Sequence, residues 1–313
     1  MTALLGRVLG RDGAVYRVAA PEGEVRAVVS GALKRAHEES REGARDREAP
    51  KVVVGDVVRL EPEPGGELFR IAGVEPRRSL LERRTPEGRG TRPVAANVDQ
   101  VVVVAATVDP APVPQLFDRL LVLAEADSLP AIVIVNKVDL DPGTALAERM
   151  RRAGYEVFGT SARTGEGLDA LADRLHRRTS VVTGPSGVGK SSLLNAIEPG
   201  LRLRTGEISA KLRRGKQTTV SAVMIPLAQG GFLLDTPGFS EVGLWDVVPR
   251  ELASCFPEMR PLISRCRYAD CRHLAEPGCA VRDAVDRGEV AADRYESYRA
   301  LLGEAVSQQS AWE

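Results

Sequence analysis

The chain has 313 residues, 43% of them hydrophobic, and its 43 Lys and Arg residues balance 43 Asp and Glu residues. This length suffices for two or three domains with separate cores, and no stretch approaches membrane-spanning length. Three of the four cysteines lie between residues 266 and 279, which favours a metal site over a disulfide framework. We therefore expect a cytoplasmic protein with no membrane partner.

The first 92 residues alternate short β-rich runs with turn residues. We expect strands near residues 6–9, 15–19, 25–29, 52–60 and 68–74. They predict a small barrel, either of OB type, whose usual ligands are oligonucleotides, or SH3-like with a structural role. The mixed charges of residues 34–50 favour a solvated loop, with an RNA contact as the minor alternative. Residues 82–92 are interpreted as a linker.

A second domain begins with residues 97–106, which are apolar on both faces, as a buried parallel strand should be. A helix is predicted over residues 112–126 and a further strand over residues 131–135. Alternating strands and helices predict a mostly parallel sheet that binds its ligand at the carboxyl ends of the strands.

Two loops of this domain predict guanine recognition. The strand at residues 131–135 runs directly into Asn136-Lys137-Val138-Asp139. The Asp139 carboxylate can accept both N1–H and the exocyclic amine of guanine, a pair of donors that adenine lacks. We expect Lys137 to cover the base plane and Asn136 to tie neighbouring loops together. A later strand ends in Ser161 and Ala162, whose backbone N–H groups resemble a second guanine loop.

A glycine-rich phosphate loop follows a strand-like run at residues 180–183 and precedes a helix. Its backbone N–H groups and the helix dipole would hold phosphate oxygens. Lys190 would contact the β- and γ-phosphates, and the Ser191 hydroxyl would bind Mg²⁺. With the two guanine loops, this favours GTP over ATP. The predicted nucleotide-binding residues here are Gly184, Pro185, Ser186, Gly187, Val188, Gly189, Lys190, Ser191 and Ser192.

A γ-phosphate sensor is expected after residues 231–234. Asp235 would hold Mg²⁺ through water, and the Gly238 amide would contact the γ-phosphate. Thr219 is slightly favoured over Thr218 as the second Mg²⁺ hydroxyl. Because the base-reading motif precedes the phosphate loop, the domain is circularly permuted relative to Ras-like GTPases.

The last part of the chain contains a candidate zinc site. Three thiolates and one imidazole can complete a closed tetrahedral shell of the structural kind. These ligands are Cys266, Cys271, His273 and Cys279. Four protein ligands leave no open position, which disfavours a zinc-dependent hydrolase. Cys255, beside Phe256, is assigned to the core. We expect domains over residues 1–92, 93–245 and 246–313.

Together these motifs resemble the circularly permuted, ribosome small-subunit-dependent GTPases known as RsgA or YjeQ. The resemblance extends from the barrel through residues 95–99 and Asp235-Thr236-Pro237-Gly238-Phe239 to the Cys-rich module. It implies an OB-fold, a permuted GTPase domain and a zinc-binding helical domain. It also implies a late assembly factor that binds the immature small ribosomal subunit and its rRNA, and leaves on GTP hydrolysis. We expect a monomer.

One position departs from the family pattern. The family usually carries histidine before the Thr-Thr pair and is thought to position the attacking water with it, whereas this chain has Gln217. Gln217 either takes that role or is a solvent-exposed side chain. The predicted catalytic residues are Lys190, Gln217, Thr219 and Gly238. The predicted reaction is slow hydrolysis of GTP to GDP and phosphate, stimulated by the subunit. The alternative is a nucleotide-switched RNA-binding module.

Overall fold

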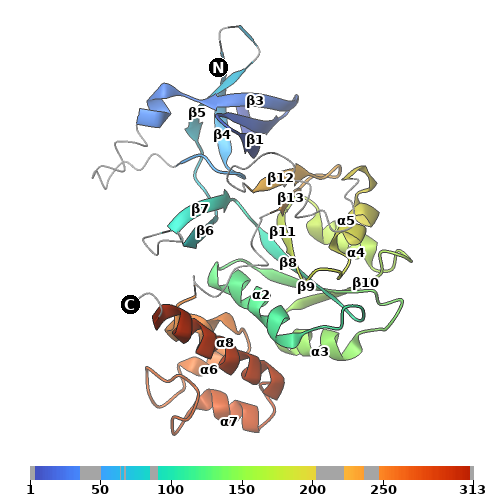
Figure 1. Ribbon diagram of the computed structural model, residues 1–313, viewed down its shortest axis with the longest axis vertical. Helices are drawn as coiled ribbons and strands as arrows, with labels where there is room; N and C mark the ends of the chain where they lie inside the picture. Colours follow the sequence, from blue (N-terminus) through green and yellow to red (C-terminus); the bar gives the residue numbers. More distant parts are fainter. Residues whose placement is uncertain are drawn as a thin grey trace.

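The computed structural model describes residues 4–35, 51–63, 65–66, 68–84, 91–201, 222–235 and 247–310. The molecule is elongated, with a β-barrel at one end, a six-stranded sheet in the middle and a helical C-terminal unit at the other end (Figure 1). Within the described ranges, no helix combines the length and the apolarity needed to cross a bilayer.

The N-terminal unit is a closed five-stranded barrel, as predicted. Its strands are β1 (Leu4–Asp12), β2 (Val15–Ala20), β3 (Gly23–Val29), β4 (Val57–Pro62) and β5 (Phe69–Val74). They follow the order β1-β2-β3-β5-β4, and β4 pairs back onto β1. Alternate side chains fill the interior, including Val8, Val18 and Ile71, which are completely buried. This closed barrel fits the OB type.

One predicted strand begins later than expected. Residues 52–60 were predicted as a strand, but β4 starts only at Val57 because Gly55 adopts φ +89°. A Cβ at Gly55 would lie 2.0 Å from the carbonyl oxygen of Ala96, so this turn requires glycine. The next residue, Asp56, is fully buried and accepts a hydrogen bond from the backbone N–H of Val53 at 2.8 Å. The turn directs the chain into the barrel.

The segment between barrel and sheet is a β-hairpin. Its strands are β6 (Leu80–Arg84) and β7 (Thr91–Ala96), so both ends of the linker predicted over residues 82–92 belong to strands. Leu81 and Ala95 are buried and anchor the hairpin, and the backbone of Ala96 donates to Val54 at 2.8 Å. The expected domain boundary between residues 92 and 93 lies inside β7.

The middle unit is an α/β sheet, as predicted. Its elements are β8 (Gln100–Ala106), α2 (Pro114–Ala126), β9 (Ala131–Asn136), α3 (Thr144–Arg152), β10 (Glu156–Thr160), α4 (Leu168–Leu175), β11 (Thr179–Thr183), α5 (Lys190–Ile197), the 3₁₀ turn η1 (Pro199–Leu201), β12 (Val223–Pro226) and β13 (Phe232–Asp235). The strand order is β10-β9-β8-β11-β13-β12, and only β12 is antiparallel. The carboxyl ends of the five parallel strands therefore share one edge, where a ligand site is expected.

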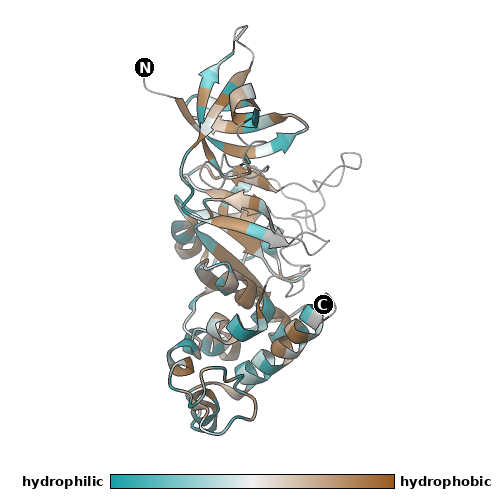
Figure 2. Cartoon of the chain, turned by 90° about the vertical axis from the view of Figure 1, so that its left-hand side faces the viewer, coloured by the Kyte–Doolittle hydropathy of each residue, from teal (hydrophilic) through white to brown (hydrophobic). Residues whose placement is uncertain are grey.

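Both faces of the sheet are covered. Every residue of β8 is buried, and successive side chains alternate between two cores. Val103 faces α2, whereas Val104 faces α4 and α5. The apolar colour in Figure 2 is concentrated in these strands. At one side of the sheet the edge strand β12 packs beside β1, so the barrel shields it.

The C-terminal unit is helical. It contains the 3₁₀ helix η4 (Pro249–Cys255), α6 (Arg260–Ile263), α7 (Ala280–Asp286) and α8 (Ala292–Ser310). Phe256 meets Tyr298 of α8 edge to face, with ring centroids 5.5 Å apart. Cys255 is 4% exposed, which confirms its place in the core, and burial raises the pKa of its thiol to about 11.

Buried charges join the helical unit to the sheet. Asp118 of α2 accepts from Arg149 of α3 and from Arg294 of α8, each at 2.7 Å, and Arg294 also pairs with Glu258 at 2.6 Å. The side chains of Asp118 and Arg294 are 0% and 1% exposed. Burial alone would raise the pKa of Asp118, but the two guanidinium groups outweigh it and lower the pKa. We call Asp118, Arg149, Glu258 and Arg294 the interdomain ion cluster.

Candidate nucleotide site and metal centre

The glycine-rich loop connects β11 to α5 and is shaped by glycines that no other residue could replace. Gly184 and Gly189 have φ of +146° and +93°. A Cβ at Gly184 would lie 2.2 Å from the carbonyl oxygen of Val104, and one at Gly189 would lie 2.5 Å from Asn136 Nδ2. Both the left-handed backbone and the close approach therefore require glycine.

Lys190 is the first residue of α5 and folds back over the loop. Its Nζ donates to the carbonyl oxygens of Gly184 at 2.6 Å and Pro185 at 2.8 Å. The next residue, Ser191, is 7% exposed, whereas Ser192 is exposed. A cationic group thus lies at the helix N-terminus, where the helix dipole also favours an anion.

Asn136 links the predicted base-reading loops to the predicted phosphate loop. It ends β9 and is 2% exposed. Its Nδ2 donates to the carbonyl oxygen of Val188 at 2.9 Å, and its Oδ1 accepts from Thr160 Oγ1 at 3.1 Å. A single buried amide therefore holds three loops in one arrangement, although they are far apart in sequence.

Asp139 lies beside Ser161, as both predicted guanine loops require. Ser161 Oγ donates to Asp139 Oδ1 at 2.6 Å, and Arg163 Nε donates to Oδ2 at 2.9 Å. The hydroxyl of Ser161, together with the charge of Arg163, holds the pKa of Asp139 below its ordinary value. Ala162 lies between these two partners in the same turn. Sequence reasoning missed Arg163, although its place directly after Ser161-Ala162 was a usable signal.

Lys137 and Val138 are held by backbone contacts on either side. Lys137 has φ +67°, its Nζ donates to the carbonyl oxygen of Asp109, and its own carbonyl accepts from Thr107 Oγ1 at 3.0 Å. Val138 N–H donates to the carbonyl oxygen of Thr160 at 3.1 Å. The loop after β8 thus positions Lys137, a role for which no sequence pattern exists.

The predicted γ-phosphate sensor lies only partly within the described residues. Asp235 ends β13, which pairs with β11, the strand that leads into the phosphate loop. Gln217, Thr218, Thr219 and Gly238 lie outside the described residues. Their predicted roles stay predictions.

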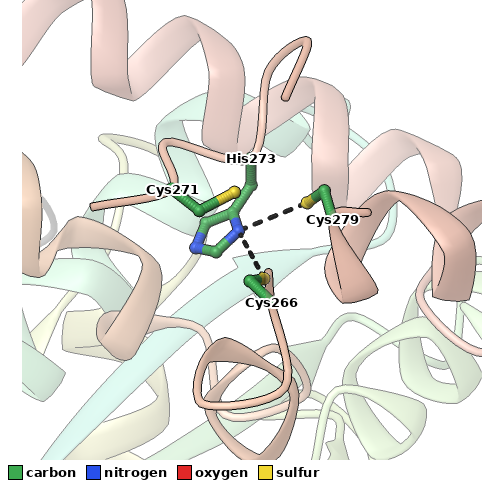
Figure 3. Close-up of side chains that lie close together, drawn as sticks. All are labelled: Cys266, Cys271, His273 and Cys279. Atoms are coloured by element: carbon green, nitrogen blue, oxygen red, sulfur yellow. Dashed lines mark hydrogen bonds between the residues drawn. The ribbon is translucent and has the colours of Figure 1, made fainter. Parts of the chain in front are cut away.

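Figure 3 shows the four predicted zinc ligands turned toward one another. His273 Nδ1 lies 3.5 Å from Cys266 Sγ and 3.4 Å from Cys279 Sγ, and all four ligand atoms, including that of Cys271, lie within 4.8 Å of one another. Typical zinc bond lengths in a tetrahedron place sulfur and nitrogen roughly 3.5 Å apart. The cluster therefore fits one four-coordinate metal ion.

Residues that are not metal ligands hold the loop that carries His273. Tyr295 and Tyr298 of α8 donate to the carbonyl oxygens of His273 and Arg272, at 2.5 and 2.7 Å. The Glu276 carboxylate accepts from the backbone N–H groups of residues 272, 274 and 275, at 2.8 to 3.0 Å. Outer contacts of this kind orient metal ligands. Glu276 was not predicted, although it lies inside the Cys-rich run.

Comparisons with known proteins agree with this geometry. A family model described as RsgA GTPase matches residues 74–245. The small ribosomal subunit biogenesis GTPase RsgA of Gemmatimonas aurantiaca is 48% identical over 311 residues, covering 97% of this chain and 98% of that protein. Its counterpart in Moorella thermoacetica is 46% identical, covering 82% and 85%.

Two solved structures share the fold over nearly the whole chain. YjeQ from Thermotoga maritima aligns with a TM-score of 0.76 and 32% identity, covering 97% of this chain and 98% of that one. YloQ, described as a circularly permuted GTPase, aligns with a TM-score of 0.74 and 30% identity, covering 98% and 96%. The chain belongs to the RsgA family of circularly permuted GTPases.

Proposed function

We propose that this GTPase acts late in the assembly of the small ribosomal subunit, is stimulated by the subunit and leaves it on hydrolysis of GTP. The main support for a nucleotide site is the pair of hydrogen bonds made by the Asn136 amide. They hold the strand end before Asp139 against the predicted phosphate loop at Val188. The curated relatives are named for small-subunit biogenesis. Their names support the small ribosomal subunit as the partner and the cytoplasm as the place of action.

The base would be read by Asp139. Its carboxylate, whose pKa the Ser161 hydroxyl and the charge of Arg163 hold below the ordinary value, can accept two N–H groups from guanine. Ser161 fixes one oxygen at 2.6 Å, so the carboxylate is oriented before a base arrives. Lys137, anchored through Nζ, would cover the base plane. Adenine offers no matching donors and would leave a buried carboxylate poorly paired.

Hydrolysis would occur by in-line attack of water on the γ-phosphate. Lys190 would neutralise charge that develops on the phosphate oxygens, and the Gly238 amide would contact them. Magnesium supplies charge neutralisation when bound, and Ser191, Thr219 and Asp235 would hold it. Catalysis without the subunit should be slow, because the residue after the predicted sensor glycine is Phe239, whose side chain cannot orient a water molecule.

The Cys₃His cluster would hold one structural zinc ion. Three thiolates and one imidazole suit zinc, and the shell has no open position for chemistry. We further propose domains over residues 1–92, 93–245 and 246–313, with the first boundary inside the β6–β7 hairpin that joins the barrel to the sheet. We also propose a monomeric chain and contact with the rRNA of the subunit through the barrel.

Turnover with and without small subunits tests this function. We expect the rate of phosphate release from GTP to rise strongly when purified immature or mature small subunits are added. Large subunits serve as the control and should leave the rate unchanged. A rate that small subunits leave unchanged would favour the alternative, a nucleotide-switched RNA-binding module with little catalytic role.

Gln217 can be tested in the same assay. If its side chain orients the attacking water, Gln217→Ala lowers subunit-stimulated turnover without weakening the affinity for GTP. Unchanged turnover would remove Gln217 from the mechanism.

A further inference from the structure

The carboxylate that would read guanine already has a cationic partner. Asp139 is 9% exposed at its side chain, whereas Arg163 is 73% exposed. Arg163 Nε donates to Oδ2 at 2.9 Å, and the buried Ser161 donates to Oδ1. Arg163 therefore reaches Asp139 from the solvent side and covers the part of the carboxylate that a ligand could approach.

Guanine needs the position that Arg163 occupies. Its N1–H and exocyclic amine lie side by side and require both carboxylate oxygens. Each oxygen has two lone pairs, so Oδ1 can keep the Ser161 hydroxyl and still accept one N–H from the base. Oδ2 also has a second lone pair, but the Asp139 side chain is only 9% exposed and the Arg163 guanidinium occupies the solvent side of Oδ2, which is the space that the base needs. Base recognition therefore requires the Arg163 side chain to move away.

The backbone around Arg163 is well held, so this movement involves the side chain alone. Ser161 Oγ accepts from the N–H groups of Arg163 at 3.2 Å and Thr164 at 3.1 Å. Ser161 also closes the turn with backbone hydrogen bonds of 3.0 Å to Gly165 and Glu166. Replacing the arginine side chain leaves all these bonds available.

Opening the Arg163–Asp139 ion pair costs little free energy, but its effect on ligand binding is large enough to measure. An ion pair with one exposed partner favours the closed form by a factor of at most about five, and salt screens it. The apparent affinity and association rate of a ligand that needs the open form fall by the same factor.

Resting on the proposed binding of guanine nucleotides at Asp139, we propose that Arg163 is the gate of the base pocket. Its guanidinium donates to Oδ2 while the pocket is closed and is displaced when the two N–H groups of guanine bind the carboxylate. A base without these donors cannot replace the hydrogen bond that Arg163 makes, so Arg163 adds to the discrimination that Asp139 provides.

Stopped-flow association of fluorescently labelled GDP with the full chain tests the gate. We expect Arg163→Ala to associate faster than the parent, by up to about fivefold at low salt, with the advantage fading above roughly 0.5 M salt. Arg152→Ala is the matched control, because Arg152 is an exposed arginine of α3. It removes the same charge and should not accelerate association. Thermal melts verify that both variants fold.

Two results would overturn the gate: an Arg163→Ala variant that associates no faster than the parent, or an advantage that persists unchanged at high salt. These outcomes are separable from failure of the proposed function, since in that case the parent chain itself would bind no labelled GDP.

Discussion

The interdomain ion cluster gives the sharpest stability prediction. Asp118→Asn keeps the shape of the side chain but leaves Arg149 and Arg294 without their shared carboxylate, at a position that is 0% exposed. Removing one member of a buried pair costs about 3–5 kcal/mol. We take about 3 kcal/mol, because Arg294 keeps Glu258 and Arg149 keeps Asp293. For a domain of this size, that lowers Tm by roughly 6–12 °C.

Differential scanning calorimetry of the full chain measures this effect. Glu289→Gln is the control. Glu289 and its partner Arg287 are both more than half exposed, so this variant should have the same Tm as the parent. An Asp118→Asn variant that also melts with the parent would refute the structural role of the cluster.

The pH dependence of the same variant has a definite sign. The pKa of Asp118 is lowered in the folded chain, so its stabilisation is complete above the ordinary value of 3.8 and is lost as pH falls through the lowered folded value. The difference in Tm between parent and variant should therefore be constant at neutral pH and shrink below about pH 4. A difference that grows on acidification would contradict this ion pairing.

Three further predictions concern the two sites. Asp139→Asn should lose roughly 10- to 100-fold in GTP affinity, because one charge-assisted acceptor is removed, and should gain affinity for xanthosine triphosphate, whose C2 oxygen accepts from the new amide. Competition titrations measure both changes, and retained GTP affinity would argue against Asp139 as the base reader. Gly184→Ala should abolish nucleotide binding, since its Cβ would lie 2.2 Å from the Val104 carbonyl oxygen, and full affinity in the variant would exclude this loop. Treatment with a metal chelator should increase hydrogen exchange over residues 266–279 while GDP binding persists; unchanged exchange there would contradict a structural metal.

Local chemistry explains what could be predicted from the sequence. The predicted phosphate loop requires glycine at Gly184 and Gly189 for reasons of backbone geometry, and β8 is apolar from Val101 to Ala106, where both of its faces are buried. Metal ligands within one short loop, such as Cys266 and Cys279, were equally readable. In each case the residues that act together are either close in sequence or follow a strict period.

The features that sequence reasoning missed depend on contacts between distant segments. Asp118 and Arg294 meet across 176 positions, and neither shows a motif. The strands of the β6–β7 hairpin were not predicted within the linker, because charged residues conceal their pattern and the buried anchors Leu81 and Ala95 depend on contacts with other segments. Arg163 differs, since it adjoins a recognised loop, yet its partner Asp139 is 24 residues away.

The most direct test of the account is calorimetric titration of the full chain with non-hydrolysable analogues of GTP and ATP in the presence of Mg²⁺. Two charge-assisted hydrogen bonds to Asp139, each contributing about 1.5 kcal/mol, predict at least ~100-fold tighter binding of the guanine analogue. Equal affinities for the two analogues would contradict a pocket in which Asp139 reads the base while Lys190 holds the phosphates.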